Sequence, residues 1–260
     1  MKFGFHEESF ILAEKTQSAG IANSLTGDTL CDIFEKTHQM KQILIIIIYL
    51  FINICVGQNF EETLPKKYHK VIETKGDLDN DGIDEIVYVY DTDKEVEELG
   101  FERELYICKV IDDKIKLWKK NKSILWKSKD GGFYSENGIE MSIEILNNTL
   151  ILKQTFQSNS RHSQTYKNIF RYQNNDWYLI GSNCTHDDNC EFNFAYDINF
   201  STKKVIVSEK YHNCEDNQKQ TQKNYYKTFK YDFKETPKMD NFVAGKKEIN
   251  IPKTRKYFYY

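Results

Sequence analysis

From residue 68 onward the chain alternates apolar and polar positions with a period of two, the pattern of half-buried β-strands. β-Branched and aromatic residues are concentrated in the same segments. No window of helical length shows a convincing period of 3.6, and the single short helix candidate is the acidic stretch Asp93–Leu99. The pattern predicts strands at Tyr68–Thr74, Glu85–Asp91, Arg103–Ile111, Lys114–Trp118, Ile139–Leu146, Thr149–Phe156, Thr165–Gln173, Asp176–Ser182, Phe192–Phe200, Lys203–Lys210 and Asn224–Lys234.

Short polar pairs join several of these strands, namely Asp112-Asp113, Asn147-Asn148, Asn174-Asn175 and Ser201-Thr202. Residues of this kind tolerate the positive φ that tight hairpin turns require. We therefore expect an all-β fold with little helix, an antiparallel meander of hairpins that closes as a sandwich or in a propeller-like way. The chain shows no strict repeat and is too short for six or seven propeller blades.

One strongly apolar run, residues 43–56, precedes the strand region. It is shorter than the roughly 20 residues of a membrane-spanning helix and has the length of a signal-peptide core. Met40 and Lys41 precede it, and Cys55 and Gly57 place small residues at −3 and −1 of a cleavage site before Gln58. We expect a signal peptide over 40–57 and a secreted or periplasmic protein.

Residues 1–39 hold six acidic residues against three lysines, which does not suit the basic start of a signal peptide. We interpret 1–39 as a non-native or disordered extension, with Met40 as the natural start, and 58–260 as a single β domain. In the alternative, Met1 is the true start and residues 43–56 anchor the chain to the membrane. After cleavage the chain would keep no stable membrane span.

Composition requires a packed core, because 17 Tyr and 17 Phe are too many to leave solvated. Removal of residues 1–57 takes away four basic and six acidic residues, so the net charge changes from −3 to −1 over the remaining 203 residues. Near-neutral charge gives no argument for nucleic acid as a partner. The tail from Tyr225 to Tyr260 alternates lysine with aromatic residues, which we interpret as an edge strand protected by lysines.

Four cysteines follow the cleavage site, an even number in an oxidising compartment. We expect Cys184 to pair with Cys190 or Cys214, because all three lie in polar, loop-like segments, and Cys108 to be a buried thiol within a strand. This assignment leaves one cysteine over. With His186 and His212 the three polar cysteines also offer zinc ligands, but their spacing is not that of a recognised finger.

The segment from Gly76 to Val89, GDLDNDGIDEIVYV, carries the clearest chemistry in the chain. Carboxylates at loop positions 1, 3 and 5 (Asp77, Asp79 and Asp81), the carbonyl of Ile83 at position 7 and Glu85 at position 9 form a set of hard oxygen ligands. Such ligands select Ca²⁺, and less readily Mg²⁺, over softer metals. An EF-hand is excluded, because Tyr88 occupies position 12 and the loop leads into a strand.

The same segment resembles the calcium loop of FG-GAP and VCBS repeats of secreted adhesion-like proteins. The resemblance implies Asp77, Asp79, Asp81 and Glu85 as ligands, with the Ile83 carbonyl and water completing the shell. Only one copy is present, whereas propellers of this type carry several. The order of the later strands also resembles uncharacterised secreted bacterial proteins of this size, which implies no activity.

Together these features predict a non-catalytic binding or surface-interaction protein with one structural Ca²⁺, which relieves repulsion between clustered carboxylates. Its partner would be an unknown protein or glycan. The alternatives are a secreted hydrolase with an unidentified active site and an immunity or inhibitor-type partner protein.

Overall fold

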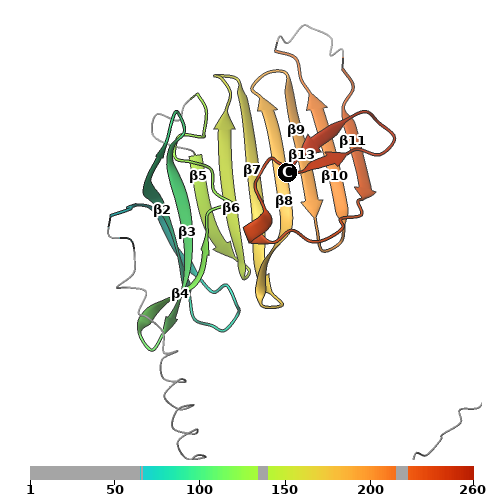
Figure 1. Ribbon diagram of the computed structural model, residues 1–260. Helices are drawn as coiled ribbons and strands as arrows, with labels where there is room; N and C mark the ends of the chain where they lie inside the picture. The colour runs from blue at the N-terminus through green and yellow to red at the C-terminus, as the bar shows by residue number, and fades with distance from the viewer. Residues whose placement is uncertain (1–64, 66, 134–139, 215–221) are drawn as a thin grey trace, which may run out of the picture. The chain divides into compact units, whose positions relative to one another are not determined.

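The computed structural model describes residues 65, 67–133, 140–214 and 222–260, which form antiparallel β-sheets (Figure 1). The first sheet has four strands in the order β1-β2-β3-β4, so each strand pairs with its neighbour along the chain. Its strands are β1 (His69–Gly76), β2 (Glu85–Val96), β3 (Gly100–Ile111) and β4 (Lys114–Asn121).

A second sheet of seven strands continues the meander in the order β11-β10-β9-β8-β7-β6-β5. The expected all-β meander is thereby confirmed, and its packing is sandwich-like. The strands are β5 (Glu140–Leu146), β6 (Thr149–Gln157), β7 (His162–Gln173), β8 (Asp176–Asp188), β9 (Phe192–Asn199), β10 (Lys204–Tyr211) and β11 (Tyr225–Lys230).

Tight turns connect the hairpins where polar pairs predict them. Both residues of each Asp-Asp or Asn-Asn pair have φ between 50° and 60°, as a two-residue type I′ turn requires. The turn after β9 is longer: Lys203 has φ 55°, and the N–H of Thr202 donates to Asn199 Oδ1 (2.9 Å). These local signals fix the register of the meander.

The acidic stretch Asp93–Leu99 is not a helix. It forms the end of β2 and the turn into β3, where Glu95 pairs with Phe101 and Val96 with Gly100. Glu98 (φ 62°) and Gly100 (φ 76°) supply the positive φ values of the turn. Pairing with β3, a contact that helix propensity ignores, decides the conformation.

One contiguous core takes side chains from both sheets. The first sheet contributes one face, including Val87 and Leu105, and the second contributes residues such as Leu152, Phe170 and Leu179, all fully buried. The opposite face of the first sheet carries a smaller cluster of Ile86, Tyr88, Tyr90, Tyr106 and Cys108.

The C-terminal segment crosses one face of the seven-stranded sheet (Figure 1). The N–H of Leu179 donates to the carbonyl of Pro237 (2.9 Å), and Phe258 stacks on Tyr196 with ring centroids 4.5 Å apart. The segment contains a 3₁₀ turn, η2 (Met239–Asn241), and a two-stranded sheet of β12 (Glu248–Asn250) and β13 (Tyr257–Tyr259). It covers core residues that the meander alone would expose.

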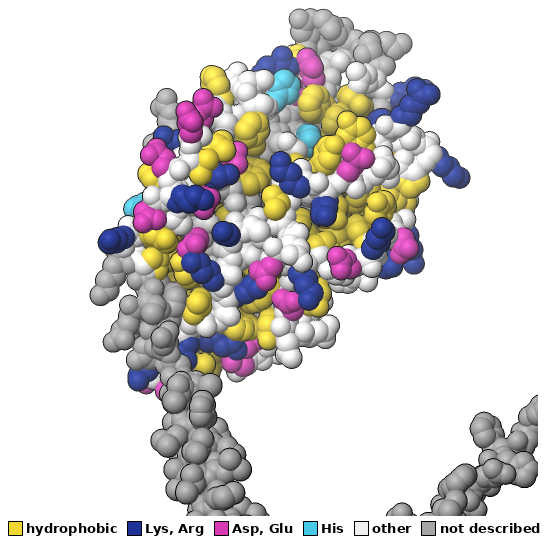
Figure 2. All heavy atoms as spheres, in the orientation of Figure 1, with side chains coloured by type: hydrophobic (Ala, Val, Ile, Leu, Met, Phe, Trp, Pro, Cys, Tyr) yellow, Lys and Arg dark blue, Asp and Glu magenta, His cyan; other side chains and the backbone are white. Residues whose placement is uncertain are grey.

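Acidic and basic side chains are interspersed over the face shown in Figure 2. Lysines and an arginine of neighbouring strands pair with acidic residues of β2 and β3, as in Arg103–Asp91 (2.7 Å), Lys94–Glu102 (2.6 Å) and Lys120–Glu104 (2.8 Å). The edge strand expected from the lysine-rich tail is β11, the last strand of its sheet.

The extension 1–39 and the signal peptide 40–57, together with the alternative membrane anchor at 43–56, lie outside the described residues. Within the described part of the chain, no helix has the length and apolar character needed to cross a bilayer.

Candidate metal centre

The loop that joins β1 to β2 contains the predicted ligands. Gly76, the last residue of β1, pairs with Glu85, the first residue of β2, so residues 77–84 form the end of this hairpin. The close approach of Ile145 to Gly76 requires glycine there, because a Cβ would lie 2.7 Å from the Ile145 Cγ2 atom. The side chain of Asn148, in the β5–β6 turn, donates to the carbonyl of Asp77 (3.1 Å). The loop is thus fixed against the second sheet.

Asp77 organises the backbone of the loop. Its Oδ1 accepts the N–H of Asn80 (2.6 Å) and its Oδ2 accepts the N–H of Gly82 (3.0 Å). Asn80 has φ 65° and Gly82 has φ 84°, so the chain turns sharply around this carboxylate. Asp77 therefore lies inside the turn, as expected for position 1 of a cation loop.

Glu85 contributes a buried carboxyl group from the start of β2, with only 1% of the residue exposed. Its Oε2 accepts the N–H of Leu78 (2.7 Å). Burial raises the pKa of Glu85, and the nearby Asp79 and Asp81 add to this, while the Leu78 N–H and Lys109 oppose it. A bound cation would favour the charged form of this group.

Asp79 forms an ion pair with Lys109 of β3, whose ammonium group also lies 4.2 Å from the ring centroid of Trp118. Burial lowers the pKa of Lys109, but the bond to Asp79 and the charges of Glu85 and Asp81 outweigh it and raise the pKa. The other oxygen of Asp79, Oδ1, is buried and has no hydrogen-bond partner in the described structure. Such an atom costs free energy unless a donor or cation reaches it.

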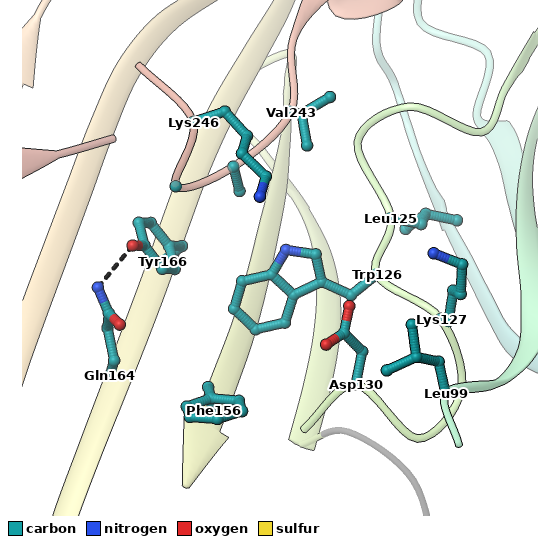
Figure 3. Close-up of a pocket in the computed structure, with 12 residues that line it drawn as sticks. Leu99, Leu125, Trp126, Lys127, Asp130, Phe156, Gln164, Tyr166, Val243 and Lys246 are labelled. Carbon is teal, nitrogen blue, oxygen red and sulfur yellow. Dashed lines mark hydrogen bonds between the residues drawn. The ribbon is translucent and has the colours of Figure 1, made fainter. Parts of the chain in front are cut away.

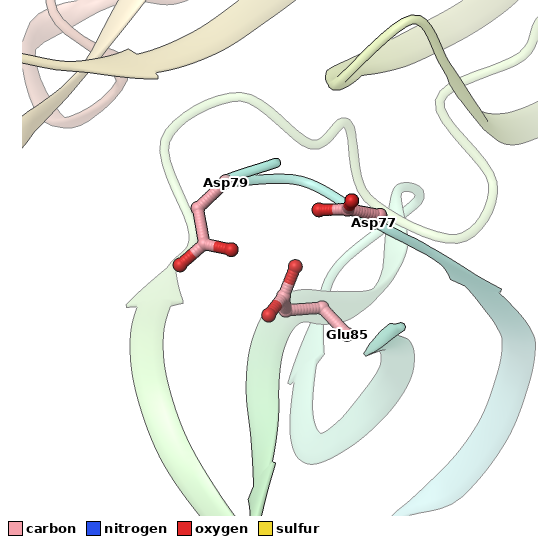
Figure 4. Close-up of side chains that lie close together, drawn as sticks. All are labelled: Asp77, Asp79 and Glu85. Carbon is pink, nitrogen blue, oxygen red and sulfur yellow. The ribbon is translucent and has the colours of Figure 1, made fainter. Parts of the chain in front are cut away.

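Three carboxyl groups converge in the loop: Asp77, Asp79 and Glu85 each place one oxygen within 4.8 Å of the others (Figure 4). This triad could hold a metal ion. Asp81 does not join the cluster; it is exposed, and its Oδ1 accepts the N–H of Ile83 (2.8 Å). The side chain of Ile83 is 51% exposed. The structure thus brings together three of the four expected carboxylates.

Leu78, Lys109 and Asn148 shape the site but are not evident from the loop pattern. Leu78 is 1% exposed and belongs to the core, so it anchors the loop between two of the acids. An apolar residue between two aspartates is the one signal that could have identified it. Lys109 and Asn148 come from distant parts of the sequence: pairing of β2 with β3 brings Lys109 to the loop, and packing of β5 against β1 brings Asn148.

The disulfide joins Cys190 to Cys214. The expected participation of Cys184 is wrong: Cys184 lies within β8 and is a free, buried thiol, as is Cys108 in β3. Burial raises the pKa of Cys184 to about 12, which keeps the thiol protonated. The disulfide also removes two of the three thiols that a zinc set would use.

Comparison of the chain with protein-family models, curated proteins and solved structures gave no match.

Proposed function

We propose that this chain is a secreted or periplasmic, non-catalytic binding protein whose β1–β2 loop holds one structural Ca²⁺ ion. The observation that carries the proposal is the convergence of Asp77, Asp79 and Glu85, with a buried oxygen of Asp79 that lacks a partner. Oxygen ligands of this kind favour a hard cation.

The geometry supports Ca²⁺ as the ion. Ca²⁺ takes six to eight oxygen ligands in flexible arrangements, whereas Mg²⁺ demands a near-ideal octahedron. Three carboxylates supply part of such a shell, and the Ile83 carbonyl, Asp81 and water are the remaining ligands that we propose. The resemblance to FG-GAP and VCBS loops supports the same choice.

A structural role follows from how the acids are held. Asp77 and Glu85 accept hydrogen bonds from the backbone of the loop itself, at Asn80, Gly82 and Leu78. A cation between these groups would offset their mutual repulsion and tie the loop to the first residue of β2. Its effect would be on stability and not on a chemical step.

Two features support an extracytoplasmic location. The Cys190–Cys214 disulfide is typical of oxidising compartments. The apolar run 43–56, with small residues before Gln58, is typical of a cleaved signal peptide.

Isothermal titration of the metal-stripped protein with Ca²⁺ tests the proposal. We expect one site in the wild type and no binding heat for Asp79→Ala. Binding should be unchanged for Asp93→Ala, a matched control at an exposed aspartate of β2 outside the carboxylate cluster. Mg²⁺ should bind more weakly. Absence of heat with the wild type, or equal loss in both variants, would refute the calcium site.

A further inference from the structure

A pocket of about 450 Å³ lies between three segments of the chain, none of which belongs to the β1–β2 loop (Figure 3). One wall is the stretch after β4, from Leu125 to Asp130; a second comes from Phe156 of β6 and from β7; the third is the C-terminal stretch from Val243 to Lys246. None of these residues is part of the carboxylate cluster.

Trp126 forms an aromatic wall of this pocket. Its backbone N–H donates to Gln154 Oε1 (2.8 Å), and Gln154 is fully buried, so the segment is fixed to β6. The indole packs edge-on against Tyr166, with ring centroids 5.6 Å apart. The ring is only partly buried, and it lies beside Phe156, Asp130 and the end of Lys246 in Figure 3.

Gln164 is a polar lining residue of the pocket, and hydrogen bonds to two neighbouring side chains fix its amide group. The amide nitrogen of Gln164 donates to the hydroxyl of Tyr166 (2.5 Å) and to Nε2 of His186 (2.6 Å). These bonds orient the amide and leave its oxygen as an acceptor. Gly245 is required beside it, because a Cβ there would lie 2.9 Å from the Tyr166 hydroxyl.

Three charged groups line the same pocket: Lys127, Asp130 and Lys246. In the described structure neither lysine has a carboxylate within 4.0 Å, and the carboxyl group of Asp130 accepts no hydrogen bond. Burial raises the pKa of Asp130, and the charges of Lys127 and Lys246 oppose this shift. Two ammonium groups against one carboxyl group leave the pocket with a positive charge that a ligand would have to match.

We propose that this pocket binds a sugar ring that carries a carboxylate, such as a uronic acid residue of an acidic glycan. The apolar face of the ring would pack on Trp126, and its hydroxyl groups would bond to Asp130 and Gln164. Its carboxylate would pair with Lys246 or Lys127. A zwitterionic amino acid has no net charge and would leave the positive charge of the pocket unbalanced, which favours the acidic sugar. This inference rests on the proposed binding role and names its ligand.

The pocket is suited to binding and not to hydrolysis. Asp130 is the only carboxyl group among the described residues that line it. Glycoside hydrolysis ordinarily needs two carboxyl groups on opposite sides of the bond. The lining residues therefore lack the second group.

Isothermal titration with digalacturonic acid tests the assignment, with neutral galactobiose and phenylalanine as comparison ligands. We expect binding of the acidic disaccharide that is at least tenfold tighter than that of galactobiose and that weakens with added salt. Lys127→Gln and Lys246→Gln should each weaken it at least threefold, because each removes a positive charge from the pocket, and Trp126→Ala should weaken it more. Lys247→Gln is the matched control, since this neighbouring exposed lysine does not line the pocket, and it should bind as the wild type does.

No binding of digalacturonic acid, equal binding of the neutral disaccharide, tighter binding of phenylalanine, or equal affinities of Lys246→Gln and the control Lys247→Gln would each overturn the assignment. Because Trp126→Ala can disturb packing on Tyr166, Lys127→Gln and Lys246→Gln carry the test. The calcium titration reads a different part of the molecule, so failure of the sugar assignment is distinguishable from failure of the proposed metal site.

Discussion

Buried carboxyl groups lie at two hairpin ends of this protein, and the charges and hydrogen bonds around them differ. At the β8–β9 turn, Oδ1 of Asp188 accepts from Arg161 (2.9 Å) and from the N–H groups of Cys190 and Glu191 (2.8 and 2.7 Å). Nε2 of His162 lies 2.7 Å from the other oxygen, Oδ2, but forms no hydrogen bond with it. In the β1–β2 loop, three carboxyl groups converge beside one ammonium group, that of Lys109.

Asp188 is neutralised by a positive side chain of the protein, Arg161. The three carboxyl groups of the β1–β2 loop have only Lys109 beside them, so their negative charge is in excess. The Cys190–Cys214 disulfide also ties the β8–β9 turn to the segment after β10. The β1–β2 loop has no disulfide among the described residues and is held by Leu78, by hydrogen bonds of its own carboxylates and by the contacts with Lys109 and Asn148. We expect the first region to be stable without ligand and the second to depend on a cation.

The largest expected effect is loss of the disulfide. Replacing Cys190 and Cys214 together by serine opens a loop that spans 24 residues, and loop-closure entropy predicts a loss of about 3.5 kcal/mol. Urea unfolding measures it, and binding of Ca²⁺ by the loop should persist. An unchanged unfolding midpoint after reduction or replacement would mean that the turn is stabilised by its ion pairs alone.

Leu78 anchors the β1–β2 loop to the core, so Leu78→Ala should cost about 3 kcal/mol in the free energy of unfolding. Ile83→Ala is the matched control in the same loop: its side chain is 51% exposed, and we expect a cost below about 0.5 kcal/mol. Urea unfolding in the presence of EDTA separates these effects from metal binding. Similar costs for the two variants would contradict the anchoring role.

The charge on Asp188 should make the β8–β9 turn sensitive to acid. Burial would raise the pKa of Asp188, but Arg161 and the two N–H groups outweigh it and lower the pKa from 3.8 to about 2. The stabilisation is therefore present above pH 3.8 and is lost as pH falls towards 2. Asp188→Asn should flatten the decline of the thermal midpoint in this window. A decline as steep as that of the wild type would assign the acid sensitivity elsewhere.

The smallest effect concerns Lys109, which competes with a metal ion for Asp79. Removing its charge in Lys109→Gln should tighten Ca²⁺ binding by about threefold to tenfold, by the Coulomb energy of partly solvated charges. Lys116→Gln, which removes a charge from the neighbouring strand β4, is the comparison. Calorimetry measures both, and weaker binding in Lys109→Gln would mean that this lysine positions Asp79 for the ion.

Local signals explain how much of the fold the sequence predicts. The Asn147-Asn148 and Asn174-Asn175 turns are predictable because asparagine tolerates the positive φ of a tight turn. The strands between these turns are predictable from the alternation of apolar and polar residues. The loop acids Asp77, Asp79 and Glu85 were likewise evident from their spacing. The pocket beside Trp126 was not evident, because Trp126, Gln164 and Lys246 come from segments that only the fold brings together.

Cys184 shows why the disulfide was mispredicted. The sequence pattern predicts a strand that ends at Ser182, before Cys184, but β8 continues to Asp188. Between Leu179 and Gly181 the pairing with β7 shifts by one residue, so Ile180 is unmatched and the alternation changes phase. Ser182 and Cys184 then face the core, while their polar neighbours face outward and give the segment the appearance of a loop.

We propose that the carboxylate triad of the β1–β2 loop binds Ca²⁺ and that the β8–β9 turn does not need the ion. Thermal unfolding of the wild type in EDTA and in Ca²⁺ at about 100 times the dissociation constant tests it most directly. We predict a midpoint about 5–10 °C higher with Ca²⁺, no such rise for Asp79→Ala, and the full rise for Asp188→Asn. Equal midpoints of the wild type in EDTA and in Ca²⁺ would contradict the account.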